Sequence, residues 1–228
     1  MTDDLLGLAR WLQLHDSAFP AGRMVHSNGI ENWLYAHPDA DDAQIERLIV
    51  DYVAQSVATL DAVIAAAAWE AATVDQLTEL DRLLLTYKTS SNARNASLQP
   101  GLQLATTARR IGLISVDDQY IRNVIAGHSP GNLAVVEGSI QAALGVSQDV
   151  CVLGTLRSAL AAALSAGVRL GRIGAMKAQQ IMVRNSAALV DLVGVATSTP
   201  LDELASSTFD LELHGMRHEW QSPRLFAT

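Results

Sequence analysis

Hydrophobic residues recur along most of the chain at steps of three and four positions, which places them on one face of an α-helix. The longest series consists of Ile45, Leu48, Ile49, Tyr52, Val53, Val57, Leu60 and Ile64. A ladder of four-residue steps follows, made of Leu153, Leu156, Leu160, Leu164 and Val168. No segment sustains the period-two alternation of a half-buried strand. The pattern therefore predicts an all-α protein.

Local signals mark where several of these helices begin and end. Asp41 lies three residues before Gln44 and predicts a helix that starts directly after it. Residues 73–76 (Thr-Val-Asp-Gln) have the spacing of a capping box, so a second helix should start there. A third helix is predicted to begin near Leu98 and to close at Gly112. A last long helix is predicted from Ile173, Met176, Val183, Ala187 and Val190.

The predicted helices form a single compact domain over residues 1–228, with roughly eight to ten helices. The breaks between helices are too short to serve as domain linkers, and they fall at residues 36–42, 115–118, 127–132 and 197–200. Residues 15–32 and 208–228 do not fit a plain helix, because each mixes large apolar side chains with Gly, Pro or charged residues. A terminal segment of that composition is expected to dock, either on the protein's own core or on a partner.

The composition is consistent with helical packing and limits the possible partners. The chain has 228 residues, of which 49% are hydrophobic and only 5% aromatic, which favours close-packed helices over a β-sandwich. The formal net charge is −8, and the arginines are scattered. A duplex-binding surface needs clustered Lys and Arg to displace counterions. Nucleic acid is therefore not an expected partner.

The sequence also predicts a cytoplasmic location. The chain opens Met-Thr-Asp-Asp, with acidic residues where a secretory signal carries basic ones. The most apolar stretch, Val150–Leu170, contains Arg157 and Arg169, so we do not expect it to span a membrane. Cys151 is the only cysteine, which rules out an intramolecular disulfide and a thiolate-rich metal site.

No recognisable catalytic motif appears in the sequence. There is no Walker A motif, and the glycines at residues 167–174 lie in a helical pattern without the dinucleotide-binding spacing. There is no G-x-S-x-G elbow, and no histidine adjoins Cys151 to activate its thiol. We therefore expect no catalytic residue and a function carried by protein contacts.

His214 and His218 are the only candidates for a metal site, and they are weak ones. At a spacing of four residues on a helix, two imidazoles point the same way and could chelate a metal ion. The zinc-hydrolase motifs place a Glu between the two histidines, whereas Arg217 lies there in this chain. A metal-dependent enzyme using His214, His218 and a distant carboxylate remains one alternative. The other is a polar segment that makes hydrogen bonds and ion pairs.

The two irregular segments carry a resemblance to a known family. Residues 216–228, with Met216-Arg217-His218-Glu219 followed by Gln221 and by Arg224-Leu225-Phe226, resemble the closing signature of the urease accessory protein UreF family. Residues 12–31, with Phe19-Pro20, Gly22, Ser27 and Gly29-Ile30-Glu31, are similar to the family's N-terminal block. The resemblance covers nearly the whole chain, and further similar stretches are residues 94–101, 132–145 and 168–180. The sequence departs from the family pattern at His26, Asn28, Asn95 and Ala175.

The resemblance implies an all-α accessory protein that forms a homodimer and performs no catalysis. Members of the family bind the UreH/UreD accessory protein and then the GTPase UreG, and the complex acts on apo-urease. The complex handles nickel, whose insertion depends on GTP, and the chain alone is expected to bind no cofactor. A helical interaction protein unrelated to urease is the remaining alternative.

The resemblance also locates the expected partner-binding residues at the two irregular segments. We expect Leu225 and Phe226 to act as apolar anchors and Arg224 as a fork-shaped hydrogen-bond donor. In the alternative, Leu225 and Phe226 cap the protein's own core. The full expected set is Phe19, Pro20, Gly22, Ser27, Gly29, Glu31, Met216, Arg217, His218, Glu219, Arg224, Leu225 and Phe226.

Overall fold

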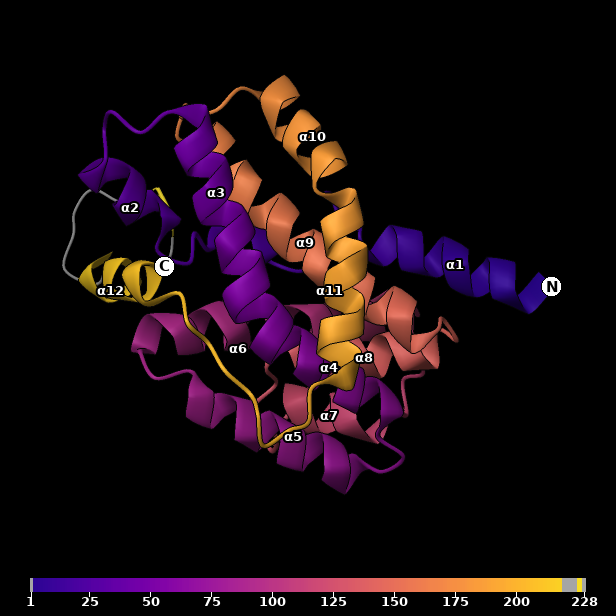
Figure 1. Cartoon of the computed structure of the whole chain (residues 1–228). Coiled ribbons are helices and arrows are strands. Elements are labelled where there is room, and N and C mark those ends of the chain that lie inside the picture. Colours follow the sequence, from indigo (N-terminus) through magenta and orange to yellow (C-terminus); the bar gives the residue numbers. More distant parts are fainter. Residues whose placement is uncertain (1, 219–224, 227–228) are drawn as a thin grey trace.

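In a computed structural model, residues 2–218 and 225–226 are described, except for the side chains of residues 2–4, 24 and 218. Every regular element of this described part is helical, so the prediction of an all-α protein is confirmed (Figure 1). The elements are α1 (Thr2–Leu14), η1 (Arg23–Val25), α2 (Ile30–Ala36), α3 (Asp42–Tyr52), η2 (Val53–Asp61), α4 (Ala62–Glu70), α5 (Val74–Tyr87), α6 (Ser91–Arg110), α7 (Gln119–Ile125), α8 (Leu133–Ala143), α9 (Gln148–Arg169), α10 (Ala175–Arg184), α11 (Ser186–Ser198) and α12 (Phe209–His218).

Both predicted capping signals are confirmed. The Asp41 carboxylate accepts a hydrogen bond from the Gln44 backbone N–H at 2.8 Å, and the Gln44 side chain accepts one from the Asp41 N–H at 2.9 Å. Thr73 and Gln76 form the same reciprocal pair at the start of α5. These side chains satisfy backbone donors that the first turn of a helix leaves unpaired, so they fix where α3 and α5 begin.

The predicted long helix from residue 45 to residue 64 is the continuous run α3–η2–α4, whose middle part is a π-helix. The predicted face is buried at Ile45, Ile49, Val53, Val57, Leu60 and Ile64. Two backbone carbonyls of the π-helix accept hydrogen bonds from outside it: Gln55 from the Ser207 N–H at 3.1 Å and Thr59 from the Ala205 N–H at 3.2 Å. The connection that leads into α12 is thereby held against η2.

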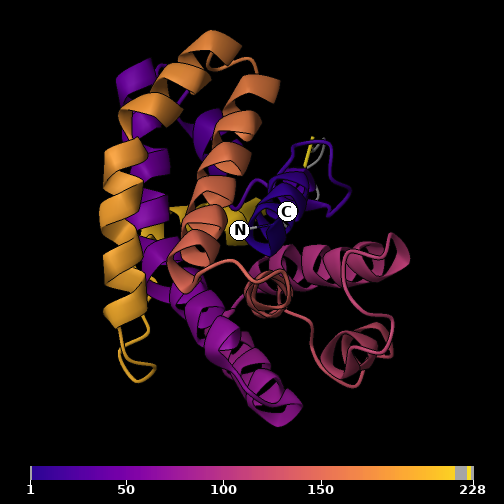
Figure 2. The same cartoon turned by 90° about the vertical axis from the view of Figure 1, so that its right-hand side faces the viewer.

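The centre of the molecule is formed by α4, which packs against α8 and α9. Gly138 of α8 lies so close to α4 that a Cβ atom would overlap the carbonyl oxygen of Ala65. The leucine ladder of α9 contributes Leu156, Leu160 and Leu164 to the same core. The orange helices α9–α11 gather beside α3 on one side of the molecule, and the pink helices α6 and α7 lie on the other (Figure 2).

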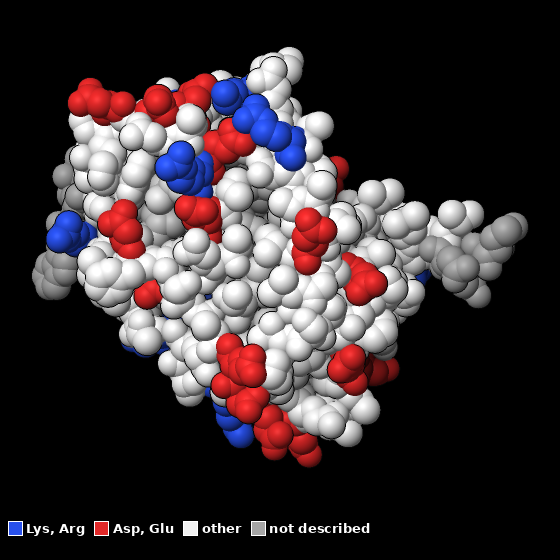
Figure 3. Space-filling view, in the orientation of Figure 1, with Lys and Arg blue, Asp and Glu red and all other residues white. Residues whose placement is uncertain are grey.

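The prediction of one last long helix was wrong, because α10 and α11 are separate helices bent by 54° at Asn185. Its predicted apolar face was also wrong: Val183 is 76% exposed, and Met176 and Val190 are exposed as well. The buried side chains are instead Ala178 and Ile181, on α10, and Leu189, Val193 and Ala196, on α11. Figure 3 shows this side of the molecule, where wide uncharged areas separate scattered acidic and basic side chains.

The predicted start of the third helix was also wrong, because α6 begins at Ser91 and not near Leu98. Ser90 caps the helix by accepting a hydrogen bond from the Ala93 N–H at 3.0 Å. The predicted end is correct, since α6 closes at Arg110 and Gly112 follows with a φ of 72°. The hydrophobic pattern could not show the first two turns, because they carry mostly polar side chains.

Two helical runs, residues 42–70 and 148–169, are long and apolar enough to cross a membrane by length and composition. The bent pair α10–α11 would add a third span by the same criterion. This differs from the expectation for Val150–Leu170, because only a few charges interrupt α9. In each of the two runs, 56% of the most apolar window is buried inside the protein, where it forms the core.

Asp81 of α5 organises the loop that precedes α8. Its fully buried carboxylate accepts hydrogen bonds from the Tyr120 hydroxyl and the Ser129 hydroxyl at 3.0 Å each. It also accepts the backbone N–H groups of Gly131 at 2.6 Å and Asn132 at 2.8 Å. Burial, reinforced by Asp81, raises the pKa of Tyr120 well above its usual value, so this hydroxyl remains a donor. One carboxylate therefore joins α5, α7 and the start of α8.

Replacing Asp81 with Ala leaves these buried donors without an acceptor, at about 1–3 kcal/mol each. Since four donors are affected, we expect the free energy of unfolding to fall by about 4 kcal/mol or more, measured by chemical denaturation. Glu79→Ala, an exposed position on the same helix, is the matched control and should change stability by less than about 0.5 kcal/mol. Equal effects of the two substitutions would contradict the role given to Asp81.

Candidate partner-docking surface

Helices α2 and α12 cross at glycines. Gly29, at the start of α2, has a φ of 85°, and a Cβ atom there would overlap the carbonyl oxygen of Leu211. Gly215 of α12 lies on the other side of the contact. A Cβ atom placed on Gly215 would lie 3.9 Å from the Cα atom of Gly29. Both the backbone conformation and the close approach require glycine at position 29. The crossing brings segments from opposite ends of the chain together (Figure 1).

Two side chains of α2 hold α12 in this position. The Asn32 amide donates to the carbonyl oxygen of His214 at 2.8 Å, in a fully buried contact. The Trp33 indole N–H donates to the Asp210 carboxylate at 2.8 Å. A hydrogen bond to the backbone of a helix fixes its rotation as well as its distance, so α12 has a defined register on α2.

A third contact ties α12 to α6. The Asn92 amide donates to the carbonyl oxygen of Gly215 at 2.6 Å. Leu211 of α12 is buried in the hydrophobic core. Helix α12 therefore packs against the protein on two sides.

Glu31 of α2 binds the end of the chain. Its carboxylate is buried and accepts the backbone N–H of Leu225 at 2.8 Å and the N–H of Phe226 at 3.2 Å. The Phe226 ring is 4% exposed, and the Arg169 guanidinium lies over it, 4.0 Å from the ring centre. Burial lowers the pKa of Arg169, while attraction to Glu31 opposes that shift. Hydrogen bonds to a charged acceptor are among the stronger ones in proteins, so we call this contact the Glu31 clamp.

Arg172, just after α9, holds the end of α2. Its guanidinium donates to the backbone carbonyls of Leu34, His37 and Pro38. The guanidinium thereby supplies donors at the C-terminal end of the helix, where the carbonyls of the last turn lack intrahelical partners. Helix α2 is therefore fixed on α9 and can serve as a rigid base for α12 and the clamp.

A cavity of about 180 Å³ lies beneath α12. Two partly buried ion pairs are part of its lining: Lys88 with Asp61 at 2.8 Å, and Arg23 with Glu137 at 2.7 Å. Since each charge has a partner of opposite sign, the ion pairs add no net charge to the cavity wall. Met216 of α12 lines the same cavity.

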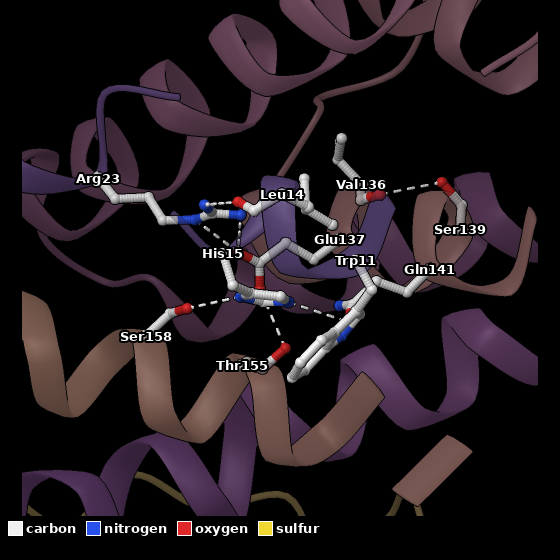
Figure 4. A network of polar contacts seen from close by, with 10 residues as sticks. All are labelled: Trp11, Leu14, His15, Arg23, Val136, Glu137, Ser139, Gln141, Thr155 and Ser158. Carbon is white, nitrogen blue, oxygen red and sulfur yellow. Dashed lines mark hydrogen bonds and ion pairs between the residues drawn. The ribbon is translucent and has the colours of Figure 1, made fainter. Parts of the chain in front are cut away.

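The Arg23–Glu137 pair belongs to a larger polar network (Figure 4). Arg23 also donates to the carbonyl oxygen of Leu14 at 3.0 Å, and Thr155 donates to the second oxygen of Glu137 at 3.0 Å. The pair thereby joins the end of α1 to α8 and α9.

His15 extends this network toward α1. Its two ring nitrogens contact the Ser158 hydroxyl at 2.8 Å and the Gln141 side-chain oxygen at 3.1 Å. Trp11 donates to the same Gln141 oxygen at 2.8 Å. Burial lowers the pKa of His15, although Glu137 opposes the shift. These contacts fix the inner end of α1, whose outer part extends away from the rest of the chain (Figure 1).

Comparison with known proteins identifies the chain's family. The UreF family model matches residues 40–186. The chain belongs to the UreF family. It is 29% identical to the urease accessory protein UreF of Allorhizobium ampelinum over 233 residues, covering 98% of this chain and 97% of the relative. It is 28% identical to the protein of that name from Cereibacter sphaeroides over 229 residues, covering 100% of both chains.

The N-terminal segment that resembles UreF divides between two places. Phe19 is half-buried against the core, and the carbonyl oxygen of Pro20 accepts a hydrogen bond from Thr107 of α6 at 3.1 Å. Gly22, with a φ of 72°, also approaches α6. Ser27 is buried just before α2. Residues 19–22 therefore face α6, while Gly29 and Glu31 face α12 and the chain end.

The C-terminal signature of the UreF-family chain contributes both buried and exposed groups. Phe226 is part of the hydrophobic core, in agreement with the alternative that it caps the protein's own body. Leu225 is 57% exposed, and Met216 and Arg217 are also exposed. The side chain of His218, together with Glu219 and Arg224, lies outside the described residues.

His214 does not belong to a metal cluster among the residues that the structure describes. No group of three or more His, Cys, Asp or Glu side chains in that part of the chain is arranged to hold a metal ion. The His214 Nε2 atom lies 3.7 Å from the Asp210 carboxylate, and its ring lies edge-on to His37 with the ring centres 5.9 Å apart.

Sequence reasoning missed several residues that build this surface. Asn32 and Trp33 directly follow the Gly29-Ile30-Glu31 motif, and a polar amide beside buried apolar residues was a usable signal. Asn92 gave no local signal, because its partner lies far away in the sequence. Arg169 and Arg172 lie in the family-like stretch 168–180, but the sequence could not show which groups they contact.

Glu31→Gln tests the Glu31 clamp, because an amide offers one acceptor oxygen in place of two and carries no charge. Hydrogen bonds to charged groups contribute about 1.5–3 kcal/mol, so exchange at the 225 and 226 amides should rise roughly ten- to hundredfold. Hydrogen exchange with mass spectrometry measures this change. Glu79→Gln, at an exposed position of α5, is the control and should leave exchange unchanged. Exchange in Glu31→Gln as slow as in this control would contradict the clamp.

Proposed function

We propose that this UreF-family chain is a non-enzymatic urease accessory protein of the cytoplasm. In this proposal it forms a homodimer and scaffolds a complex with the UreH/UreD accessory protein and the GTPase UreG. The complex inserts nickel into apo-urease in a GTP-dependent reaction. Support comes from the relatives, which are named urease accessory proteins, and from the surface formed by α2, α12 and residues 225–226.

The observation that carries the proposal is the meeting of two family-like segments in one place. The Glu31 clamp brings residues 225 and 226 onto α2, and the glycine crossing brings α12 there as well. A hollow between α2 and α12 is lined in part by Tyr35 and Arg217. A surface built from segments near both chain ends on a fixed helix suits protein recognition. Because these segments are already held in place, binding a partner costs little conformational entropy.

Apolar groups on this surface are available to a partner. Tyr35 and Leu225 are more than half exposed, and Met216 is exposed in part. Burying one such side chain fully contributes about 1.5–3 kcal/mol. Arg217 adds an exposed guanidinium, a group suited to a carboxylate on the partner. We assign this surface to the UreH/UreD accessory protein.

Nickel enters the proposal as cargo of the complex. We propose that the chain alone binds no metal or other cofactor and that UreH/UreD, UreG and apo-urease join in its transfer. The metal-dependent enzyme considered from the sequence would require His214 and His218 with a distant carboxylate, and the side chain of His218 lies outside the described residues.

Leu225→Ala separates partner binding from folding. Because Leu225 is mostly exposed, the substitution should leave the stability of the chain nearly unchanged. Loss of its buried contact should weaken binding to the UreH/UreD partner about five- to thirtyfold, measured by pulldown and titration. Val183→Ala, an exposed apolar truncation on α10, is the control and should bind normally. Equal affinities of the two variants would contradict the assignment of this surface.

The function as a whole is tested by coexpression of urease with its accessory proteins, with and without this chain. We expect urease activity to depend on the full chain and to be lost when residues 215–228 are removed. Unchanged activity without the chain would contradict the proposed function. Unchanged partner binding after the truncation would contradict only the location of the surface.

A further inference from the structure

His214 lies inside the contact that holds α12 on α2. The residue is only 6% exposed, and its backbone carbonyl accepts the hydrogen bond from Asn32. The buried ring and the carbonyl that positions the helix thus belong to the same residue of the interface. Any change in the charge of this ring acts directly on the α2–α12 contact.

The surroundings of the ring favour the neutral form. Nε2 faces the Asp210 carboxylate at 3.7 Å, and a carboxylate can only accept, so the ring hydrogen is assigned to Nε2. Nδ1 is buried and has no hydrogen-bond partner among the described residues. Protonation would place a charged N–H group at Nδ1, a buried position to which none of the described residues supplies an acceptor.

The charged groups around His214 come from both helices of the contact. On α12, Asp210 attracts a protonated ring and Arg217 repels it; His37, directly after α2, also repels it. The titratable groups within α2 are Glu31, which accepts the N–H groups of residues 225 and 226, and Tyr35, which lines the same hollow as His214. Helix α6 contributes the uncharged Asn92.

From this geometry we propose that the α2–α12 contact is an acid-sensitive latch, in which protonation of His214 releases α12 from α2. Release would separate the parts of the proposed docking surface and uncover the cavity beneath α12. The inference rests on the proposed function for its role, which is to allow partner binding at neutral pH and to oppose it in acid.

The direction of the pH effect follows from the pKa of the ring. Burial lowers the pKa of His214, Asp210 opposes this shift, and His37 and Arg217 add to it. The released helix therefore binds a proton more readily than the docked helix. The contact is at full strength above the ordinary histidine pKa of 6.5 and weakens as the pH falls below that value.

Hydrogen exchange of the full chain at pH about 7.5 and about 5.5 tests the latch, with rates corrected for the intrinsic effect of pH. Protection of the α12 amides, relative to those of α9, should fall in acid. The fall should be at most about tenfold per pH unit, because release of α12 is coupled to the uptake of one proton. Equal relative protection at both pH values would overturn the proposal.

His214→Gln keeps an amide donor toward Asp210 but cannot take up a proton. In this variant the loss of α12 protection in acid should disappear, and a loss equal to that of the wild type would overturn the proposal. His128→Gln, at an exposed position outside the contact, is the matched control and should behave like the wild type. If His214→Gln does not fold, the comparison of wild-type hydrogen exchange at the two pH values still tests the proposal. Since the isolated chain is used, a failed partner pulldown would leave this result unaffected.

Discussion

Glu31 is almost inaccessible to water, and a carboxylate in such a place must be supplied with donors or with opposite charge. The backbone N–H groups of residues 225 and 226 are among its donors, and Arg169 adds attraction from α9. Residues 225 and 226 are therefore positioned by the need of the buried Glu31 carboxylate for hydrogen-bond donors. The exposed Leu225 side chain takes its place on the surface as a consequence.

The rest of the surface is arranged around the same helix. Arg172 fixes the end of α2 on α9, and the glycine crossing allows α12 to approach α2 closely. Hydrogen bonds from α2 and α6 then reach the backbone of α12 itself. The base of this surface is thus part of the core, whereas α12 is held by the buried Leu211, the glycine crossing and a few polar contacts, one of them to the backbone of the buried His214. In the proposed latch, this arrangement allows α12 to be released at low pH while the helices of the core keep their packing.

Local features were predictable from the sequence, and features that depend on tertiary contacts were not. The capping pairs at Asp41 and Thr73 were correct because their partners lie three residues away. The periodicity of the α10–α11 region correctly predicted helix. Periodicity cannot tell which of two apolar faces is buried, so Val183 was wrongly assigned to the buried face. The family resemblance pointed to both irregular segments. It could not show that residues 19–22 turn toward α6 or that Glu31 binds residues 225 and 226.

The central claim is that α2, α12 and residues 225–226 together receive a partner protein. Hydrogen exchange of the chain, free and in complex with the UreH/UreD accessory protein, tests it most directly. We predict that complex formation increases protection in α2, in α12 and at residues 225–226, and leaves α5 and α7 unchanged. Protection confined to other elements, such as the exposed apolar side of α10 and α11, would contradict the claim.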